Sequence, residues 1–318
     1  MKAIDIDQCF GKALHSYQSA KTREDYNATL AELTTILRES HDLSPLVRRN
    51  CLLLSAKCLQ SLDRVEEAVQ SLQDLLNEIE VEPSIEDLGF RAAVKLSLAE
   101  GFKSIGKWNE AIDLFSDVTK YFQQNGDWQS EVNIYRTIAL LYQNHNKMDK
   151  AIAFLEAARP ILDKYTETPI HQEILFALGH CHYISGNVGT AIALEERALA
   201  LARRFGDTQT ENQLIHNLAE FTFNVQDFRR ALHYISKRLK IAQDSEDSDS
   251  IIRYLLHLSA CYTETGQSNE ALKIYDKVEK LLLNQDQQAS LVHGMCLLGK
   301  AQVFIDVGGH DYSPLKLN

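Results

Sequence analysis

Small and bulky apolar residues recur along this chain with a period of forty residues. The small residues that mark the period are Ala111, Ala151, Ala191, Ala231 and Ala271. Twelve positions before each marker stands a second small residue, in the set Ala99, Ala139, Gly179, Ala219 and Ser259. Four positions after the marker stands a large apolar residue, in the set Phe115, Leu155, Ile235 and Tyr275, but Glu195 breaks this set. Small residues at two facing points let two helices approach closely, so the pattern predicts repeated antiparallel helix pairs.

The pattern extends beyond this regular middle. Ala68 marks an earlier repeat and Thr29 a degenerate first one, which gives seven repeats. Helices are expected at about 4–20, 24–39, 45–62, 65–80 and 85–106, and in the same alternation to about residue 305. A lone eighth helix of the first type is expected from about Ala289 to Val307. It either caps the last apolar face or belongs to a longer protein that continues beyond this sequence.

The joints between helices support the same register. A turn residue precedes each marker by five positions, in the set Gly106, Asn146, Gly186, Gln226 and Gly266. Between repeats, Gly126-Asp127 and Gly206-Asp207 are eighty residues apart, and Glu246-Asp247 lies forty residues further on. Glycine adopts the left-handed conformation that ends a helix, and aspartate accepts hydrogen bonds from the N–H groups that begin the next. These joints therefore predict helix ends.

This layout resembles the tetratricopeptide repeat (TPR), in which a helix, a short turn and a second antiparallel helix carry small residues at fixed positions. The resemblance covers nearly the whole chain. It is to the long class of about forty residues per repeat, found in kinesin light chains, spindle-orientation adaptors, rapsyn and Rap regulators. It implies an all-α fold, a right-handed α-solenoid of about seven helix pairs with one C-terminal capping helix. Residues 1–307 would form a single superhelical array, and residues 308–318 an irregular C-terminal tail.

Composition narrows the function classes. A net charge of −11 argues against a general nucleic-acid binder, whose affinity depends on neutralising phosphates. The chain has no run of eighteen apolar residues and no apolar stretch typical of a signal peptide near its first residue. We therefore expect a cytoplasmic protein without membrane insertion. The six cysteines form no metal-binding pattern and are expected to be reduced core thiols.

Catalytic motifs are absent from the sequence. It has no phosphate-binding glycine loop, no zinc-protease helix motif and no nucleophile elbow. In His180-Cys181-His182 the two histidines are two positions apart, so on a helix they point in different directions and cannot share a metal ion. The sequence therefore predicts a protein that is not an enzyme and binds no cofactor or metal.

In TPR scaffolds the partner normally binds the concave surface, which the first helix of each repeat lines. Counting back from the marker alanines places a polar, amide-rich set there, together with His257. The predicted partner-binding residues are Lys103, Asn133, Arg136, Asn144, His180, Tyr183, Gln213, Asn217, Glu220, Phe223, Asn224 and Arg253. Asn217-Leu218-Ala219 is similar to the Asn-Leu-small motif with which spindle-orientation adaptors hold extended peptides.

Positive charge is concentrated in the fifth and sixth repeats. We call these residues the basic zone: Arg203, Arg204, Arg229, Arg230, Lys237, Arg238 and Lys240. The zone is either a solvated helix face or a docking patch for an acidic partner segment. The sequence alone leaves both interpretations open.

The resulting functional hypothesis is a non-enzymatic adaptor that holds a protein or peptide segment in the concave groove. One alternative is a rapsyn-like receptor-clustering scaffold, on a resemblance through Tyr17-Gln18-Ser19 and Cys296-Leu297-Leu298-Gly299. Another is a peptide-responsive regulatory switch similar to the Rap regulators. Self-association through the C-terminal end is a further expectation, because an uncapped repeat array exposes an apolar face.

Overall fold

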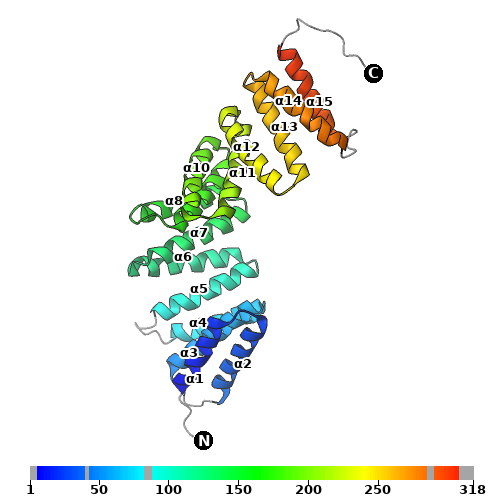
Figure 1. The fold of residues 1–318 in the computed structure, drawn as a ribbon. Coiled ribbons are helices and arrows are strands. Elements are labelled where there is room, and N and C mark those ends of the chain that lie inside the picture. Colours follow the sequence, from blue (N-terminus) through cyan, green and yellow to red (C-terminus); the bar gives the residue numbers. More distant parts are fainter. Residues whose placement is uncertain (1–5, 40–42, 82–87, 285–289, 308–318) are drawn as a thin grey trace. The chain divides into compact units, whose positions relative to one another are not determined.

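The computed structural model describes residues 6–39, 43–81, 88–284 and 290–307, and within these ranges the regular structure consists of fifteen α-helices (Figure 1). The first helices of the seven pairs are α1 (Ile6–Ser19), α3 (Pro45–Ser61), α5 (Leu88–Ser104), α7 (Trp128–Asn144), α9 (Pro169–Ile184), α11 (Thr208–Asn224) and α13 (Ser248–Glu264). Their partners are α2 (Arg23–Glu39), α4 (Val65–Val81), α6 (Trp108–Asn125), α8 (Met148–Leu162), α10 (Val188–Phe205), α12 (Phe228–Asp244) and α14 (Ser268–Asn284). The eighth first-type helix is α15 (Leu291–Val307). The predicted all-α repeat of helix pairs is confirmed.

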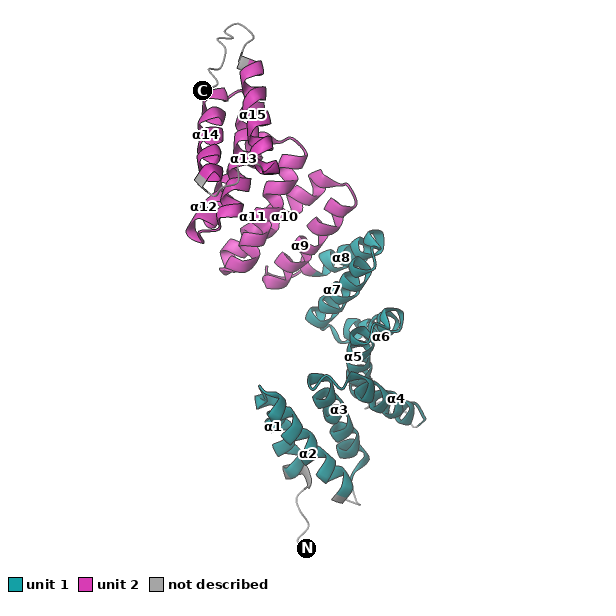
Figure 2. Ribbon diagram, turned by 90° about the vertical axis from the view of Figure 1, so that its right-hand side faces the viewer, with its two compact units in different colours: residues 1–161 teal, residues 162–318 magenta. Residues whose placement is uncertain are grey.

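The chain divides into two compact units, residues 1–161 and residues 162–318 (Figure 2). Unit 1 contains α1 to α7 and nearly all of α8, and unit 2 contains α9 to α15. The single array over residues 1–307 stays a prediction. The predicted tail, residues 308–318, lies outside the described residues.

The marker residues lie where the two helices of each pair meet. Thr29 is 1% exposed, and the six marker alanines from Ala68 to Ala271 are fully buried. In unit 1, Phe115 packs in one core cluster with Leu72 and Ile138, residues of three different helices. The close helix–helix contacts that the repeat pattern predicts are therefore present in both units.

Unit 2 repeats this arrangement with different side chains. Leu214 and Leu218 of α11 are fully buried and pack in one cluster with Ile235 of α12. Towards α15, Tyr275 of α14 packs with the buried Cys296 and Val303. The last helix is thus held to unit 2 by the same kind of core.

The turns inside the repeats have left-handed backbone geometry at the predicted positions. The φ angles are 78° at Gly106, 54° at Asn146, 82° at Gly186, 61° at Gln226 and 73° at Gly266. In the Gln226 turn the N–H of the following Asp227 donates to the Thr222 carbonyl over 2.9 Å, as in a Schellman motif. The predicted turns are confirmed, including two that use a residue other than glycine.

The joints between repeats also follow the prediction. Gly126 and Gly206 have φ angles of 70° and 72°, and Glu246 takes the same conformation with φ of 56°. The side chains of Asp127, Asp207 and Asp247 each accept a 3.1 Å hydrogen bond from the backbone N–H three residues on. Each aspartate therefore caps the first helix of the next repeat.

Replacing Gln226 by glycine is expected to stabilise unit 2 by about 0.5–1 kcal/mol. The left-handed conformation costs an L-residue about 1–2 kcal/mol, and the added flexibility of glycine in the unfolded chain offsets part of the gain. Urea unfolding followed by circular dichroism measures the change. The reciprocal control is Gly266→Gln, because a Cβ at Gly266 meets nothing within 4 Å and only the backbone conformation opposes it. If Gly266→Gln left stability unchanged, backbone strain would not be the cause.

Candidate partner-binding site

All twelve predicted partner-binding residues lie on first helices, and each is at least partly exposed. In unit 1, Lys103 is on α5 and Asn133, Arg136 and Asn144 are on α7. The members in unit 2 are His180 and Tyr183 on α9, Gln213, Asn217, Glu220, Phe223 and Asn224 on α11, and Arg253 on α13. Their placement on one helix of each pair agrees with the repeat register. It stays a prediction that the residues of both units line one groove.

In unit 2, contacts between side chains join three successive first helices. The Tyr183 ring stacks on Phe221 with 3.8 Å between centroids, and its hydroxyl accepts a 2.9 Å hydrogen bond from Asn224 Nδ2. Phe223 stacks on His257 with 4.9 Å between centroids. We call Tyr183, Phe223, Asn224, His257 and the neighbouring Arg253 the aromatic row. It runs from α9 across α11 to α13.

Two arginines lie beside a buried tyrosine at the α13 end of this row. The guanidinium groups of Arg238 and Arg253 lie 5.4 and 5.8 Å from the centre of the Tyr254 ring. Arg238 Nε also donates to the Tyr254 hydroxyl over 3.1 Å. Among the described residues, neither guanidinium lies within 4.0 Å of a carboxylate oxygen. This part of unit 2 therefore carries positive charge that no ion pair neutralises.

The pKa values of two nearby histidines are lowered, first by burial and then in part by this positive charge. Burial, followed by the positive charge of Arg253, lowers the pKa of His257, and Glu220 opposes this shift. Burial also lowers the pKa of His216, where Glu220 again raises it and Arg238 and Arg253 lower it further. Both shifts favour the uncharged imidazole, which is the form that stacks on an aromatic ring without placing a charge in the contact.

Ion pairs inside unit 2 neutralise part of the basic zone. Arg203 Nε lies 2.7 Å from Glu211, and Arg204 lies 2.6 Å from Glu167. Arg230 pairs with Asp227 over 2.7 Å and contacts Glu196 over 3.4 Å. The zone as a whole therefore offers less free positive charge than its sequence indicates, and its member Arg238 contacts Tyr254.

Glu195 is a buried acid on the helix-pairing face of α10. It is 0% exposed, and its Oε1 accepts a 3.0 Å hydrogen bond from Asn217 Nδ2. A Cβ built on Gly179, in the facing helix, would lie 2.6 Å from Glu195 Cγ, so only glycine leaves the space that this side chain occupies. Burial raises the pKa of Glu195 to about 8, against the opposing hydrogen bond from Asn217. Asn217, a predicted partner-binding residue, thus also donates a hydrogen bond to a buried side chain.

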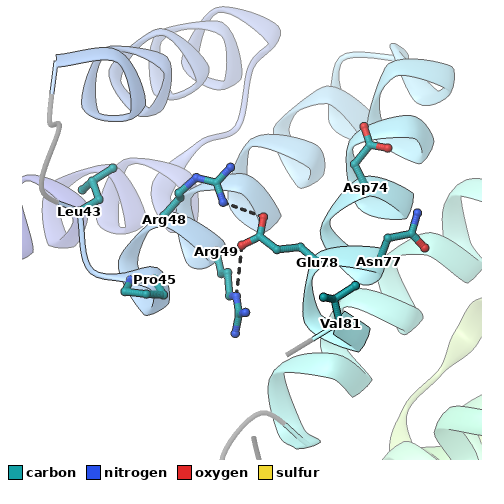
Figure 3. A pocket seen from close by; sticks show the side chains of 8 residues that line it. All are labelled: Leu43, Pro45, Arg48, Arg49, Asp74, Asn77, Glu78 and Val81. Carbon is teal, nitrogen blue, oxygen red and sulfur yellow. Dashed lines mark hydrogen bonds and ion pairs between the residues drawn. The ribbon is translucent and has the colours of Figure 1, made fainter. Parts of the chain in front are cut away.

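Unit 1 has a cavity of about 580 Å³ between the start of α3 and the end of α4 (Figure 3). Glu78 bridges two arginines across it, at 2.6 Å from Arg48 and 3.4 Å from Arg49. Hydrogen bonding to Arg48 holds the pKa of Glu78 below its usual value. Asp74 also lines the cavity, so two acids stand against two arginines and the formal charges of its lining balance.

The cysteines are free thiols, and five of the six are buried. Burial raises the pKa of Cys51 and Cys58 to about 11, so both stay protonated and unreactive at neutral pH. Among the described residues, no three His, Cys, Asp or Glu side chains come together as metal ligands would. No helix in the described ranges has the length and apolar character needed to cross a membrane.

The fold and its repeat register define a TPR-type helical-repeat protein. Comparison with protein families identifies one family: the model of the soluble NSF attachment protein, SNAP, matches residues 2–234. This match covers most of the chain, which therefore belongs to the SNAP family.

Sequence and structure comparisons agree with the repeat class. Tetratricopeptide repeat protein 29 of Trypanosoma brucei brucei is 23% identical over 234 residues, which are 70% of this chain and 48% of that protein. The chain thus spans about half of that relative. The C-terminal part of a TPR repeat-containing protein from Cytophaga hutchinsonii has a TM-score of 0.62 at 12% identity, over 86% of this chain and 95% of that one.

A Rap protein solved in complex with competence and sporulation factor has a TM-score of 0.50 at 13% identity, over 96% of this chain and 89% of that one. At these identities the two structural likenesses show the fold. The resemblance to rapsyn-type scaffolds stays a prediction.

Sequence reasoning found most of the aromatic row but not its surroundings. Tyr254 and His216 were not among the predicted site residues, although Tyr254 Oη lies 3.4 Å from His216 Nδ1, and Arg238 was named only as a member of the basic zone. Tyr254 follows the predicted Arg253 directly, which is the signal that was available. Only one feature of the sequence indicated the hydrogen bond between Asn217 and Glu195: the acid at position 195 interrupts the set of large apolar residues.

Proposed function

We propose that this protein is a non-enzymatic, cytoplasmic scaffold that binds an extended segment of a partner protein along the first helices of unit 2. The observation that carries the proposal is the aromatic row, in which stacked rings and a hydrogen bond join α9, α11 and α13. Aromatic and arginine side chains dominate the energies of protein interfaces. A row that is already ordered also loses less conformational entropy when a partner binds.

The chemistry of the row suits a peptide. Asn224, and Gln213 about three helical turns earlier on α11, have amide groups that both donate and accept hydrogen bonds, as a peptide backbone requires. Gln213 and Asn224 are exposed, so their polar groups remain accessible. The SNAP family match and the fold shared with a Rap protein complexed with competence and sporulation factor support a protein-binding role. Buried cysteines that form no disulfide are typical of proteins from a reducing compartment, which supports the cytoplasmic assignment.

The predicted self-association is a separate part of the proposal and rests on α15. Large apolar side chains of this helix are exposed, at 82% for Leu291, 73% for Leu298 and 59% for Ile305. In α13 the residue that corresponds to Leu298, forty positions earlier, is the buried Leu258. A further helix that packed on α15, from a second copy or another chain, would bury this face.

The double variant Tyr183→Ala, Phe223→Ala is expected to lose the partners that the wild-type chain retains from a cell lysate. Both rings are part of the aromatic row, where Tyr183 stacks on Phe221 and Phe223 stacks on His257, so their removal takes away contact area. Affinity capture with quantitative mass spectrometry measures the loss, and circular dichroism checks that the variant is folded.

The matched control is Arg197→Ala, Lys277→Ala, which alters two exposed residues of the second helices α10 and α14 in the same unit, outside the basic zone. Partners lost only from the row variant would support the proposal. Retention of the same partners by both variants would contradict it. A partner-induced compaction seen by small-angle scattering would instead favour the regulatory-switch alternative.

A further inference from the structure

A cavity of about 280 Å³ lies between α13 and α15, next to the arginine end of the aromatic row. Four apolar side chains line it: Ile252, Leu256, Val292 and Met295. The row contributes Arg253 and His257 to the same walls. The cavity thus joins an apolar lining to the surface on which we propose that a partner segment binds.

The size of the cavity indicates what it holds. Sites for whole small-molecule ligands have volumes of about 300–1,000 Å³ and bury most of the ligand. At about 280 Å³ this cavity is smaller, and it is open to solvent, since Met295 on its wall is 56% exposed. These dimensions suit one large apolar side chain that projects from a longer segment.

The charge beside the cavity indicates what flanks that side chain. Arg253 donates a 3.2 Å hydrogen bond to Ser250 Oγ and lies beside the Tyr254 ring, and among the described residues no carboxylate oxygen lies within 4.0 Å of its guanidinium. Arg238 adds a second unneutralised guanidinium beside the same ring. An arginine in this state favours a carboxylate, which it can bind with two parallel hydrogen bonds.

Three acids of unit 2 act against this attraction. Asp249 lines the cavity one helical turn before Arg253, and Asp247 interacts electrostatically with Arg253. Glu220 of α11 lies 3.9 Å from His216, but the lowered pKa of His216 favours the uncharged imidazole, so this carboxylate is not neutralised. An incoming acid must therefore meet Arg253 away from these three carboxylates.

We propose that this cavity anchors an acidic, apolar segment of the partner protein: a leucine or phenylalanine side chain enters it, and a neighbouring carboxylate binds Arg253. The inference rests on the proposed function and locates one end of the binding surface. It names the chemistry of the segment, which the aromatic row alone does not.

The three methionines of the chain provide a direct test, because Met295 lines the cavity and Met148 lies in unit 1. The full chain, labelled with ¹³C-methyl methionine, is titrated with the synthetic peptide acetyl-Glu-Asp-Leu-Phe-Asp-Glu-amide and followed by NMR. We expect a saturable shift of the Met295 methyl signal and no shift of the Met148 signal. Peptides with alanine for the apolar pair, or lysine for the acids, are expected to leave Met295 unmoved.

Variants separate the two parts of the anchor. Arg253→Ala is expected to weaken binding of the acidic peptide at least tenfold, and Asp249→Asn to strengthen it about two- to threefold, because one removes the attraction and the other the repulsion. Arg197→Ala is the matched control, an exposed arginine of α10 outside both the basic zone and the cavity lining.

Two outcomes would overturn the inference: no Met295 shift with the acidic peptide, or a shift that Arg253→Ala leaves unchanged. The titration is run at constant protein concentration, because the proposed self-association through α15 would itself move the Met295 signal. If capture of partners depended on Tyr183 and Phe223 while Met295 did not respond, the anchor would fail and the proposed function would stand.

Discussion

Unit 2 is expected to lose stability as the pH rises from about 4.5 to about 8, and Glu195→Gln is expected to remove most of this loss. The carboxyl of Glu195 titrates near 4.5 in the unfolded chain and at about 8 in the folded one, because burial disfavours its charged form. Below about 4.5 it is protonated in both states. As the pH rises through the folded pKa the buried group ionises, and the stability is lost.

The expected size of this effect is on the order of 5 kcal/mol, since each unit of pKa difference corresponds to about 1.36 kcal/mol. Glutamine keeps the length of the side chain and an oxygen that accepts from Asn217, but it carries no titrating proton. Urea unfolding at one-unit intervals from about pH 5 to about pH 9, for the wild type and the variant, measures the difference.

The matched control for this prediction is Glu196→Gln. Glu196 is the next residue on α10, is partly exposed, and pairs with Arg230 and the Tyr234 hydroxyl. Its replacement is expected to leave the pH dependence of unit 2 nearly unchanged. If the free energy of unfolding changed with pH in the same way in the wild type and in Glu195→Gln, the raised pKa of the Glu195 carboxyl would not be the cause of the pH dependence.

Gly179→Ala is expected to destabilise unit 2 by about 2 kcal/mol, although alanine occupies the corresponding position in three of the other regular repeats. A Cβ on residue 179 would lie 2.6 Å from Glu195 Cγ and 3.4 Å from the Ala191 carbonyl oxygen. Relieving this contact means moving a side chain that is packed in the helix interface and bonded to Asn217. The strain outweighs the roughly 1 kcal/mol that alanine gains over glycine in a helix.

A double-mutant cycle tests this explanation. In the Glu195→Ala background, Gly179→Ala is expected to be neutral or stabilising, because the Cγ that it would contact is absent. The control is Gly189→Ala in α10, where a Cβ meets nothing within 4 Å, and this change is expected to stabilise slightly. An equal cost of Gly179→Ala in both backgrounds would rule out the contact with Glu195 as its cause.

Local features of this fold were predictable because the interactions that form them connect residues close in sequence. The turn at Gln226 is closed by a hydrogen bond between Asp227 and Thr222, five positions apart. The cap at Asp207 reaches only to Thr210. The marker alanines repeat at the spacing that brings the same helix faces together, so their burial followed from periodicity alone.

The candidate site was predictable only in part. The repeat register placed Tyr183, Phe223 and Arg253 on first helices, and the structure confirms that placement. It could not show that Tyr183 bonds to Asn224 or that Phe223 stacks on His257, because those pairs are 41 and 34 positions apart. Such contacts depend on the distance between repeats and on side-chain rotamers, which a pattern of residue types does not contain.

The sequence by itself determined the helix pairs, their turns and caps, and which helix of each pair carries the candidate residues. Only the tertiary structure decided that the chain divides into two compact units, that Glu195 lies inside the space left by Gly179, and which arginines remain unneutralised. Helical periodicity is local and is written directly in the spacing of residues. Charge pairing and burial instead depend on which side chains meet through space, and that is settled only when the helices pack.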